Sequence, residues 1–294
     1  MNIGIFLKSR DKKEGGGYTI TYDIFEKLIN DINLINHKLY FVIINDLSKE
    51  IKSLLKKNKI NYINIKENKF SYKLKNYLFC KFPLLLKFIN LFNADKIENY
   101  YKENNVEIIW PISSELRHPF SIPYLFTLWD LQHKTISEYQ EVGSFFTKLY
   151  REQLIKINLN KAKYIICGTN VGLKEIQKFY KIKQKKIILN NHPTPSWVNS
   201  KKSKSKSFLK KIDIRNFFLY PANFWSHKNH LNLLKGFKIF LEKKKIFYLV
   251  LVGNIIDKNL YDEIMGYINK QKLNRFVRLL GYVSRKNLLE FRSF

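Results

Sequence analysis

Residues 217–254 contain one complete strand–helix–strand unit, FFLYPANFWSHKNHLNLLKGFKIFLEKKKIFYLVLVGN. The apolar run Phe217–Tyr220 predicts a buried strand, and the periodicity that follows predicts a helix over about Lys228–Lys244. The run Tyr248–Val252 predicts the next strand. Because a helical crossover brings the chain back to the same edge of a sheet, the two strands are expected to be parallel. This unit therefore predicts an α/β fold.

The same alternation of strands and helices fills the chain before this unit. Seven short runs of β-branched and aromatic residues predict buried parallel strands: Ile3–Leu7, Leu39–Ile44, Ile60–Ile65, Val106–Trp110, Tyr124–Leu128, Tyr164–Cys167 and Ile187–Leu189. Ile20, Ile24 and Leu28 recur at helical spacing between the first two runs. The pattern predicts a doubly wound sheet with helices on both faces.

The polar stretch 190–211 interrupts this pattern, because its two prolines are followed by KKSKSKSFLKK, which has too few apolar side chains to join a core. We therefore predict a Rossmann-like domain over 1–191, a basic linker over 192–211 and a second Rossmann-like domain over 212–294. The second domain holds only about three predicted strands, the last at Val277–Leu280. Sheets of this kind usually have about five or more strands, so this domain is predicted to be incomplete.

The charge of the chain first suggests a nucleic-acid partner, because its formal net charge is +29. However, 45 of the 53 basic residues are Lys, and they are spread along the whole sequence. Such spacing is more typical of a solvated surface than of a groove for a polyanion, so no nucleic-acid partner is expected. The charge does favour smaller anionic partners, such as nucleotide sugars, and acidic lipid surfaces.

The sequence gives no support for a disulfide framework or a zinc site, since Cys80 and Cys167 lie far apart and neither has a second Cys or His at metal-ligand spacing. No secretory signal is expected, because charged residues follow the strand-length run Met1–Leu7 at once. The stretch Tyr77–Phe92 is broken by Lys and Pro and is too short to span a membrane. It suits either an interfacial segment or an amphipathic helix packed on its own domain. A cytoplasmic location with peripheral membrane contact is the expectation.

Glycines Gly15, Gly16 and Gly17 lie between the first predicted strand and a helix beginning near Tyr18. Glycine allows a close backbone approach, and the N-terminus of the following helix favours an anion such as a diphosphate. The three glycines do not form the G-x-G-x-x-G fingerprint or a P-loop, which weakens a dehydrogenase or NTPase interpretation. The alternative is a surface loop in which the glycines only turn the chain.

Trp129-Asp130-Leu131-Gln132-His133 directly follows a predicted strand, at the edge where open α/β sheets bind ligands. Asp130 can accept hydrogen bonds from sugar hydroxyls, and the charge of His133 can change near neutral pH. Both are predicted catalytic residues. The structural alternative is that Asp130 caps a helix or turn and His133 bonds the backbone.

Lys228 stands where the second domain passes from its first strand into its first helix. A cation at a helix N-terminus is unfavourable, and a bound diphosphate would relieve that conflict. The alternative is a solvated Lys228 with His227 and His230 as surface caps.

These motifs together carry a family resemblance. YPANFWSHKNHLNLLKGF, YLVLVGN and LLGYVSRKNLLEF resemble the second domain of glycosyltransferase family 4, which are retaining enzymes of the GT-B fold. MNIGIF with GGGYTITYDIFEKL, LFTLWDLQH and AKYIICGTNVGLKEIQKFY resemble the first domain in the same order. The resemblance implies a mannosyltransferase-like enzyme of surface polysaccharide synthesis. It would move a hexosyl group from a GDP- or UDP-sugar to a glycan or lipid-linked acceptor, without a metal or other cofactor.

The resemblance also implies roles for individual residues. Gly16 and Gly17 match the loop that approaches the donor phosphates, and Lys228 matches the lysine that neutralises the leaving diphosphate. Asn223 stands where many members have an Arg. Trp129 stands where many have a His beside the reacting sugar, and His133 would take over the role of that His.

The remaining implied donor-binding residues are His227 and Asn229, which flank Lys228. The family's acidic motif would follow the helix that carries Glu290, and Phe294 comes first, so the sequence resembles a carboxy-truncated enzyme. The alternative function is an inactive remnant or a non-catalytic binding protein of the same fold.

Overall fold

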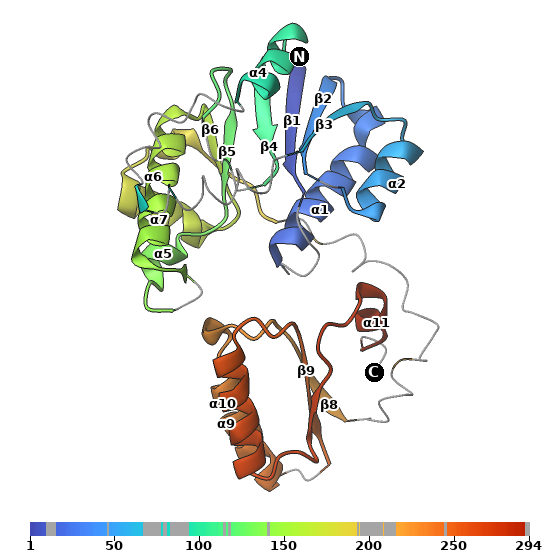
Figure 1. Ribbon diagram of the computed structural model, residues 1–294, viewed down its shortest axis with the longest axis vertical. Helices are drawn as coiled ribbons and strands as arrows, with labels where there is room; N and C mark the ends of the chain where they lie inside the picture. The colour runs from blue at the N-terminus through green and yellow to red at the C-terminus, as the bar shows by residue number, and fades with distance from the viewer. Residues whose placement is uncertain are drawn as a thin grey trace. The chain divides into compact units, whose positions relative to one another are not determined.

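The computed structural model describes residues 1–9, 16–45, 47–66, 78, 81–82, 94–113, 116, 119–139, 142–192, 194, 208, 216–243 and 246–291. The chain divides into two compact units, Met1–Thr194 and Pro195–Phe294 (Figure 1). The predicted linker over 192–211 lies outside the described residues except at positions 192, 194 and 208. The predicted interfacial stretch Tyr77–Phe92 also lies outside them except at positions 78, 81 and 82.

The first unit is built on parallel strands. They are β1 (Asn2–Lys8), β2 (Lys38–Ile44), β3 (Tyr62–Ile65), β4 (Ile108–Pro111), β5 (Leu125–Leu128), β6 (Tyr164–Cys167) and β7 (Ile187–Leu189). Pairing gives the orders β3-β2-β1-β4 and β5-β6-β7, and a parallel bridge between Ile109 and Tyr124 links β4 to the start of β5. The first six strands thus follow the Rossmann order 3-2-1-4-5-6. All seven predicted strands are confirmed to within two residues at each end.

Helices connect these strands, and polar side chains mark several of their starts. They are α1 (Gly16–Asn30), α2 (Lys49–Lys57), α4 (Ala94–Glu103), α5 (Gln132–Thr135), α6 (Phe145–Lys161) and α7 (Asn170–Tyr180), with short 3-10 turns η2 (Ile32–Leu34) and η5 (Gln184–Lys186). The hydroxyls of Ser48, Ser144 and Thr169 accept a backbone N–H of the first turn of α2, α6 and α7. Such caps satisfy N–H groups that have no partner within the helix.

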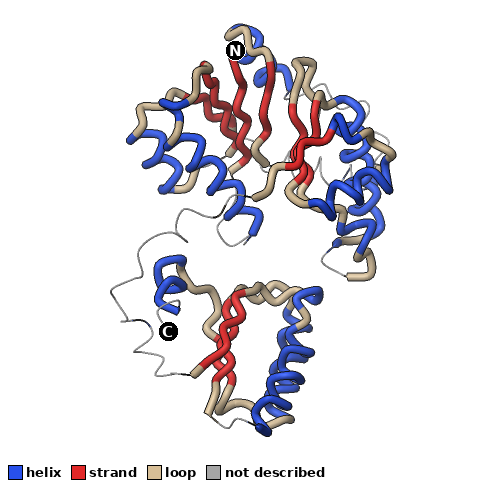
Figure 2. Tube along the Cα trace, turned by 180° about the vertical axis from the view of Figure 1, so that it is seen from behind, coloured by secondary structure: helices blue, strands red, loops and turns tan. Residues whose placement is uncertain are grey.

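Side chains from alternate positions of β1 fill two different cores. Ile5 and Leu7 pack with α1 and α2 on one face of the sheet, while Phe6 packs with α4, α6 and α7 on the other. Helices therefore cover both faces, as Figure 2 shows from behind. A sheet buried on both faces explains why the strands are nearly continuous apolar runs, and the predicted doubly wound arrangement is confirmed.

The second unit is a smaller sheet of the same kind. Its described strands are β8 (Phe217–Pro221), β9 (Tyr248–Val252) and β10 (Val277–Leu279), all parallel in the order β10-β9-β8. Its described helices are α9 (His230–Lys243), α10 (Lys258–Lys270) and α11 (Arg285–Glu290), with the 3-10 turn η7 (Ser226–Lys228) before α9. Leu249 and Leu251 pack with α9 and α10, whereas Val250 and Val252 pack with Phe291 after α11.

The predicted helix over about Lys228–Lys244 is confirmed as α9, which starts two residues later than predicted. Asn229 has a φ of 55°, in the left-handed region, so a right-handed helix cannot run through it. Lys228 therefore ends the 3-10 turn, and α9 begins at His230.

No helix in the described part of the chain is long and apolar enough to cross a membrane.

Candidate functional site

In each unit the predicted site residues follow the carboxyl ends of parallel strands. Gly16 and Gly17 come after β1, the segment Trp129–His133 comes after β5, and the segment Asn223–Asn229 comes after β8. Carboxyl ends of parallel strands share one edge, and ligands of open α/β sheets bind outside that edge. We call Trp129–His133 the 129–133 loop and Ala222–Asn229 the 222–229 loop, and describe each within its own unit.

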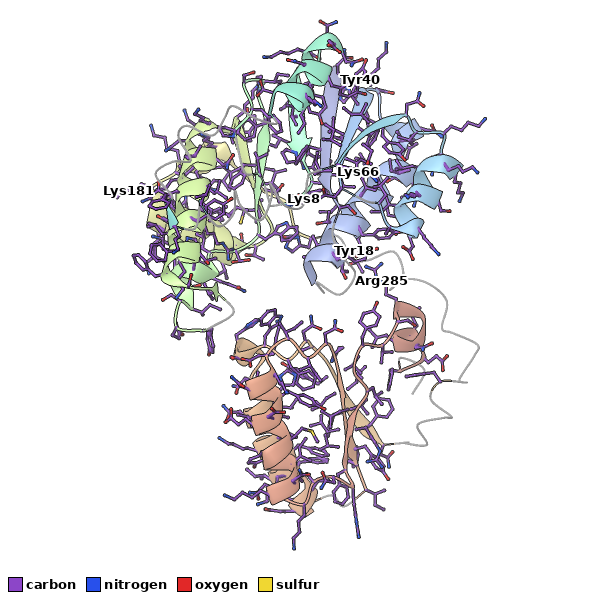
Figure 3. All side chains as sticks on the ribbon, viewed as in Figure 1. Lys8, Tyr18, Tyr40, Lys66, Lys181 and Arg285 are labelled. Carbon is purple, nitrogen blue, oxygen red and sulfur yellow. The ribbon has the colours of Figure 1, made fainter. Side chains whose placement is uncertain are left out.

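The glycine motif is described only in part, because Gly15 lies outside the described residues. Gly16 is exposed and begins α1, and a Cβ built on it would meet no atom within 4 Å. The site thus offers open space and a helix N-terminus, although sterics do not demand glycine at position 16. Lys8 lies buried at the end of β1, and Tyr18 lies in the first turn of α1 (Figure 3). Phosphate contact by Gly16 and Gly17 stays a prediction.

Asp130 is held by an ion pair and by its own backbone turn. Its Oδ1 accepts from Nη2 of Arg151 at 2.6 Å and from the backbone N–H of Gln132 at 3.0 Å. Arg151 also donates to the Asp130 carbonyl at 3.3 Å. Asp130 therefore caps a turn, as the structural alternative expected, yet its half-exposed side chain leaves Oδ2 without a hydrogen bond to any described residue.

His133 is buried within a polar cluster. Its Nε2 lies 2.9 Å from Oε2 of Glu152, and the Tyr180 hydroxyl donates to the same oxygen at 2.7 Å. Oε1 of Glu152 pairs with Lys134 at 3.0 Å and with Lys156 at 3.1 Å. Only 6% of His133 is exposed, so in this conformation it contacts protein rather than solvent.

The cluster also fixes the charge states of its members. Burial alone would raise the pKa of Glu152, but hydrogen bonds from Tyr180, His133, Lys134 and Lys156 outweigh it and lower that pKa to about 2. Burial lowers the pKa of His133, the Glu152 hydrogen bond opposes this, and the charge of Arg151 adds to the lowering. At neutral pH an ionised Glu152 thus faces a neutral His133.

Arg151, Glu152 and Tyr180 are part of this site, and the sequence analysis missed them. Glu152 is the residue with a visible sequence signal, because it precedes the buried Ile155 by three residues and Leu159 by seven. A carboxylate on the apolar stripe of a helix predicts a buried polar partner.

In the second unit, backbone contacts join the loops that follow β8 and β9. The backbone N–H of Asn254 donates to Oδ1 of Asn223 at 2.9 Å, and the N–H of Phe224 donates to the Asn254 carbonyl at 3.0 Å. A Cβ added to Gly253 would lie 2.1 Å from the Ala222 carbonyl oxygen. Asn223 therefore uses its carbonyl oxygen within the protein, while its amide N–H groups make no hydrogen bond to a described residue.

Lys228 is exposed at the end of the 222–229 loop. The Tyr220 hydroxyl donates to the Lys228 carbonyl at 2.7 Å and fixes its backbone. His227 is half-buried, and Asn229 is exposed in its left-handed conformation. Asn223, His227, Lys228 and Asn229 thus all lie on the loop that follows β8.

His230 is not the surface cap that the structural alternative expected. It is 1% exposed, and its ring stacks on Phe224 with centroids 4.5 Å apart and 12° between the planes. Burial lowers the pKa of His230, and the charge of Lys228 lowers it further.

Glu290 is also buried, in α11, and accepts the Phe208 N–H at 2.9 Å. No cluster of three or more His, Cys, Asp or Glu side chains that could hold a metal occurs among the residues described here.

The structure is similar to several solved structures of low sequence identity. Anabaena Alr3699/HepE, in complex with UDP and glucose, is 13% identical, and the match covers 97% of this chain and 71% of that one with a TM-score of 0.62. Sucrose-phosphate synthase from Thermosynechococcus elongatus is 14% identical, with coverage of 99% and 73% and a TM-score of 0.59. UDP-GlcNAc 2-epimerase from Neisseria meningitidis, bound to UDP-GlcNAc, is 11% identical, with coverage of 100% and 75% and a TM-score of 0.59.

The chain has the GT-B fold. The predicted fold class, two Rossmann-like units with parallel sheets, is thereby confirmed. No family model matches the sequence, and no curated protein matches it. Membership of glycosyltransferase family 4 stays a prediction, as do the carboxy-terminal truncation and the role of each site residue.

Proposed function

We propose that this chain is a glycosyltransferase that moves a hexosyl group from a nucleotide sugar to a hydroxyl of a glycan or lipid-linked acceptor, with retention at the anomeric carbon. The observation that carries the proposal is the 222–229 loop, which follows the carboxyl end of β8, is joined to the loop after β9 through Asn223, and carries both Lys228 and Asn223. A diphosphate at this edge would meet the Lys228 cation and the amide N–H groups of Asn223, which bond none of the described residues.

The donor is held by the second unit in this proposal. Lys228 neutralises charge that grows on the diphosphate as the bond to the anomeric carbon breaks. Asn223 donates to a phosphate oxygen, and His227 and Asn229 border the same position. Gly16 and Gly17 of the first unit are further proposed phosphate contacts, because the N-terminus of α1 favours an anion and a Cβ on Gly16 would meet no atom within 4 Å. UDP-sugars are the first donors to test, since UDP-glucose and UDP-GlcNAc are bound in similar structures.

The acceptor is held by the first unit. Oδ2 of Asp130 accepts a hydrogen bond from the reacting hydroxyl, and His133 acts through the loop that carries Asp130. The acceptor oxygen bonds to the anomeric carbon, the bond from that carbon to the diphosphate breaks, and the hydroxyl proton passes to the departing diphosphate. The net charge of +29 supports peripheral contact with an anionic membrane that carries a lipid-linked acceptor.

The test has two stages. Calorimetric titration with UDP, GDP, UDP-glucose, UDP-GlcNAc and GDP-mannose first establishes whether a nucleotide binds. Turnover is then followed with the bound sugar nucleotide and a panel of glycan and lipid-linked acceptors, with chromatography of the sugar product. Transfer with a retained anomer supports the proposal. Binding without turnover would favour the non-catalytic alternative, and an epimerised sugar nucleotide would replace the transferase assignment with an epimerase.

A further inference from the structure

We propose that Arg151 and Glu152 of α6, together with Tyr180 of α7, are positioning residues that hold the 129–133 loop so that Oδ2 of Asp130 faces the acceptor hydroxyl. This inference rests on the proposed function, because it names the residues that set the geometry of the acceptor side.

Consecutive residues of one helix reach both ends of the loop. Successive side chains leave an α-helix about 100° apart, so Arg151 and Glu152 point in different directions from nearly the same height. Arg151 meets Asp130 at 2.6 Å, and Glu152 meets His133 at 2.9 Å. The loop is thus fixed at two points against a helix of 17 residues.

Arg151 also selects which oxygen of Asp130 stays available. Oδ1 receives both the Arg151 guanidinium and the Gln132 N–H, whereas Oδ2 has no described partner. Because one oxygen is occupied twice, the carboxylate cannot rotate without losing two hydrogen bonds. Oδ2 is therefore held in one direction, which is what orientation of a reacting hydroxyl requires.

Glu152 is the centre of the second fixed point. Its carboxylate binds His133 and Lys134 of α5, Lys156 of α6 and Tyr180 of α7, so one buried charge ties three helices together. Buried charges persist only when such partners compensate them. Ionised Glu152 also accepts the Nε2–H of His133, which fixes the ring as the neutral Nε2–H tautomer.

The groups that face the His133 ring make this tautomer testable. Arg151 and Glu152 face it from α6, Lys134 from α5 and the Tyr180 hydroxyl from α7, with the hydroxyl 3.4 Å from Nε2. Nitrogen-15 NMR of histidine-labelled protein distinguishes the two neutral tautomers and the imidazolium. A His133→Gln spectrum assigns the signal among the six histidines.

The variants are Glu152→Gln, Tyr180→Phe and Arg151→Met, and the matched control is Glu138→Gln, which alters an exposed carboxylate on the neighbouring segment. We expect Glu152→Gln to abolish the exclusive Nε2–H signal of His133 and to lower kcat for transfer by up to about 100-fold. Arg151→Met should lower kcat while leaving the His133 tautomer intact. Donor Kd should stay within about twofold in every variant, because none of the altered residues is a proposed donor contact.

Two outcomes would overturn the inference. One is a His133 signal that keeps its exclusive Nε2–H tautomer in Glu152→Gln; if that variant fails to fold, a kcat for Tyr180→Phe equal to that of Glu138→Gln has the same consequence. The other is a kcat for Arg151→Met equal to that of Glu138→Gln. If the wild-type chain transfers no sugar, the proposed function fails, while the NMR comparison still decides whether Glu152 fixes His133.

Discussion

Replacing Gly253 by Ala tests how closely the loops of the second unit must pack. The added Cβ would lie 2.1 Å from the Ala222 carbonyl oxygen and 2.8 Å from Cα of Asn223, and both neighbours are rigid backbone atoms. The loops after β8 and β9 must separate by about 1 Å to remove such an overlap. That movement breaks the pairing of Asn223 and Phe224 with Asn254.

The cost can be worked out from these contacts. Two hydrogen bonds contribute about 1 kcal/mol each, and overpacking a tight site costs about 1–3 kcal/mol. Gly253→Ala should therefore lower the free energy of unfolding of the second unit by about 3–5 kcal/mol, a large part of the stability of a typical domain. Because the same loops carry Asn223 and Lys228, UDP affinity should fall as well.

Gly236 and Gly266 provide the controls, since a Cβ on either meets no atom within 4 Å and both lie inside helices. Alanine at each position should raise stability by about 0.5–1 kcal/mol through helix propensity. Urea unfolding followed by circular dichroism measures all three variants. A Gly253→Ala protein as stable as the Gly266→Ala protein would refute the close approach of the two loops.

Three further outcomes are expected. Lys228→Ala should weaken UDP binding by about 10- to 100-fold, because it removes a charge-assisted hydrogen bond. Lys235 is an exposed lysine of α9, and Lys235→Ala should leave the calorimetric Kd within about twofold; equal effects would make Lys228 an ordinary surface residue. Because burial holds the pKa of His230 below the unfolded value of about 6.5, the free energy of unfolding should be highest above that pH and fall as the pH drops below it; His230→Phe should lose the His230 share of this dependence and keep the share due to buried His133, and a variant whose Tm falls between pH 7.5 and pH 5.5 as much as that of the wild type would contradict the prediction. Asp130→Asn and His133→Ala should each lower acceptor turnover about tenfold or more with donor Kd nearly unchanged, and steady-state kinetics with unaltered kcat would remove both residues from the acceptor side.

Strand positions were predictable from the sequence because a parallel sheet buried on both faces requires continuous apolar runs, as in Ile3–Leu7. The exact start of α9 could not be predicted from the sequence. It depends on Asn229 adopting the left-handed conformation, and Asn can adopt either the left-handed or the right-handed one. His230 shows a different limit. Its burial depends on a stack with Phe224, which the sequence places six residues away but does not mark as a contact.

The 129–133 loop shows why candidate residues were found more easily than their partners. Asp130 and His133 follow a strand end, and that position alone identifies a ligand edge. Their partners Arg151 and Glu152 lie about 20 residues later on a helix, and the pairing depends on how α6 packs beside α5. Apolar periodicity predicts which face of a helix is buried, but not how far the helix is shifted along its axis relative to its neighbour. The pairs Asp130–Arg151 and His133–Glu152 therefore could not be assigned from sequence spacing.

The ligand edges of the two units are held by different kinds of contact. The 222–229 loop is fixed by backbone hydrogen bonds and by a glycine that leaves no room for a side chain. The 129–133 loop is fixed by ion pairs between side chains, Asp130 with Arg151 and Glu152 with Lys134. Backbone pairing is little affected by salt, whereas the half-exposed Asp130–Arg151 pair is weakened by salt screening. The geometry of the proposed donor edge should therefore persist as salt is raised, while at the proposed acceptor edge the contact between Asp130 and Arg151 should weaken first.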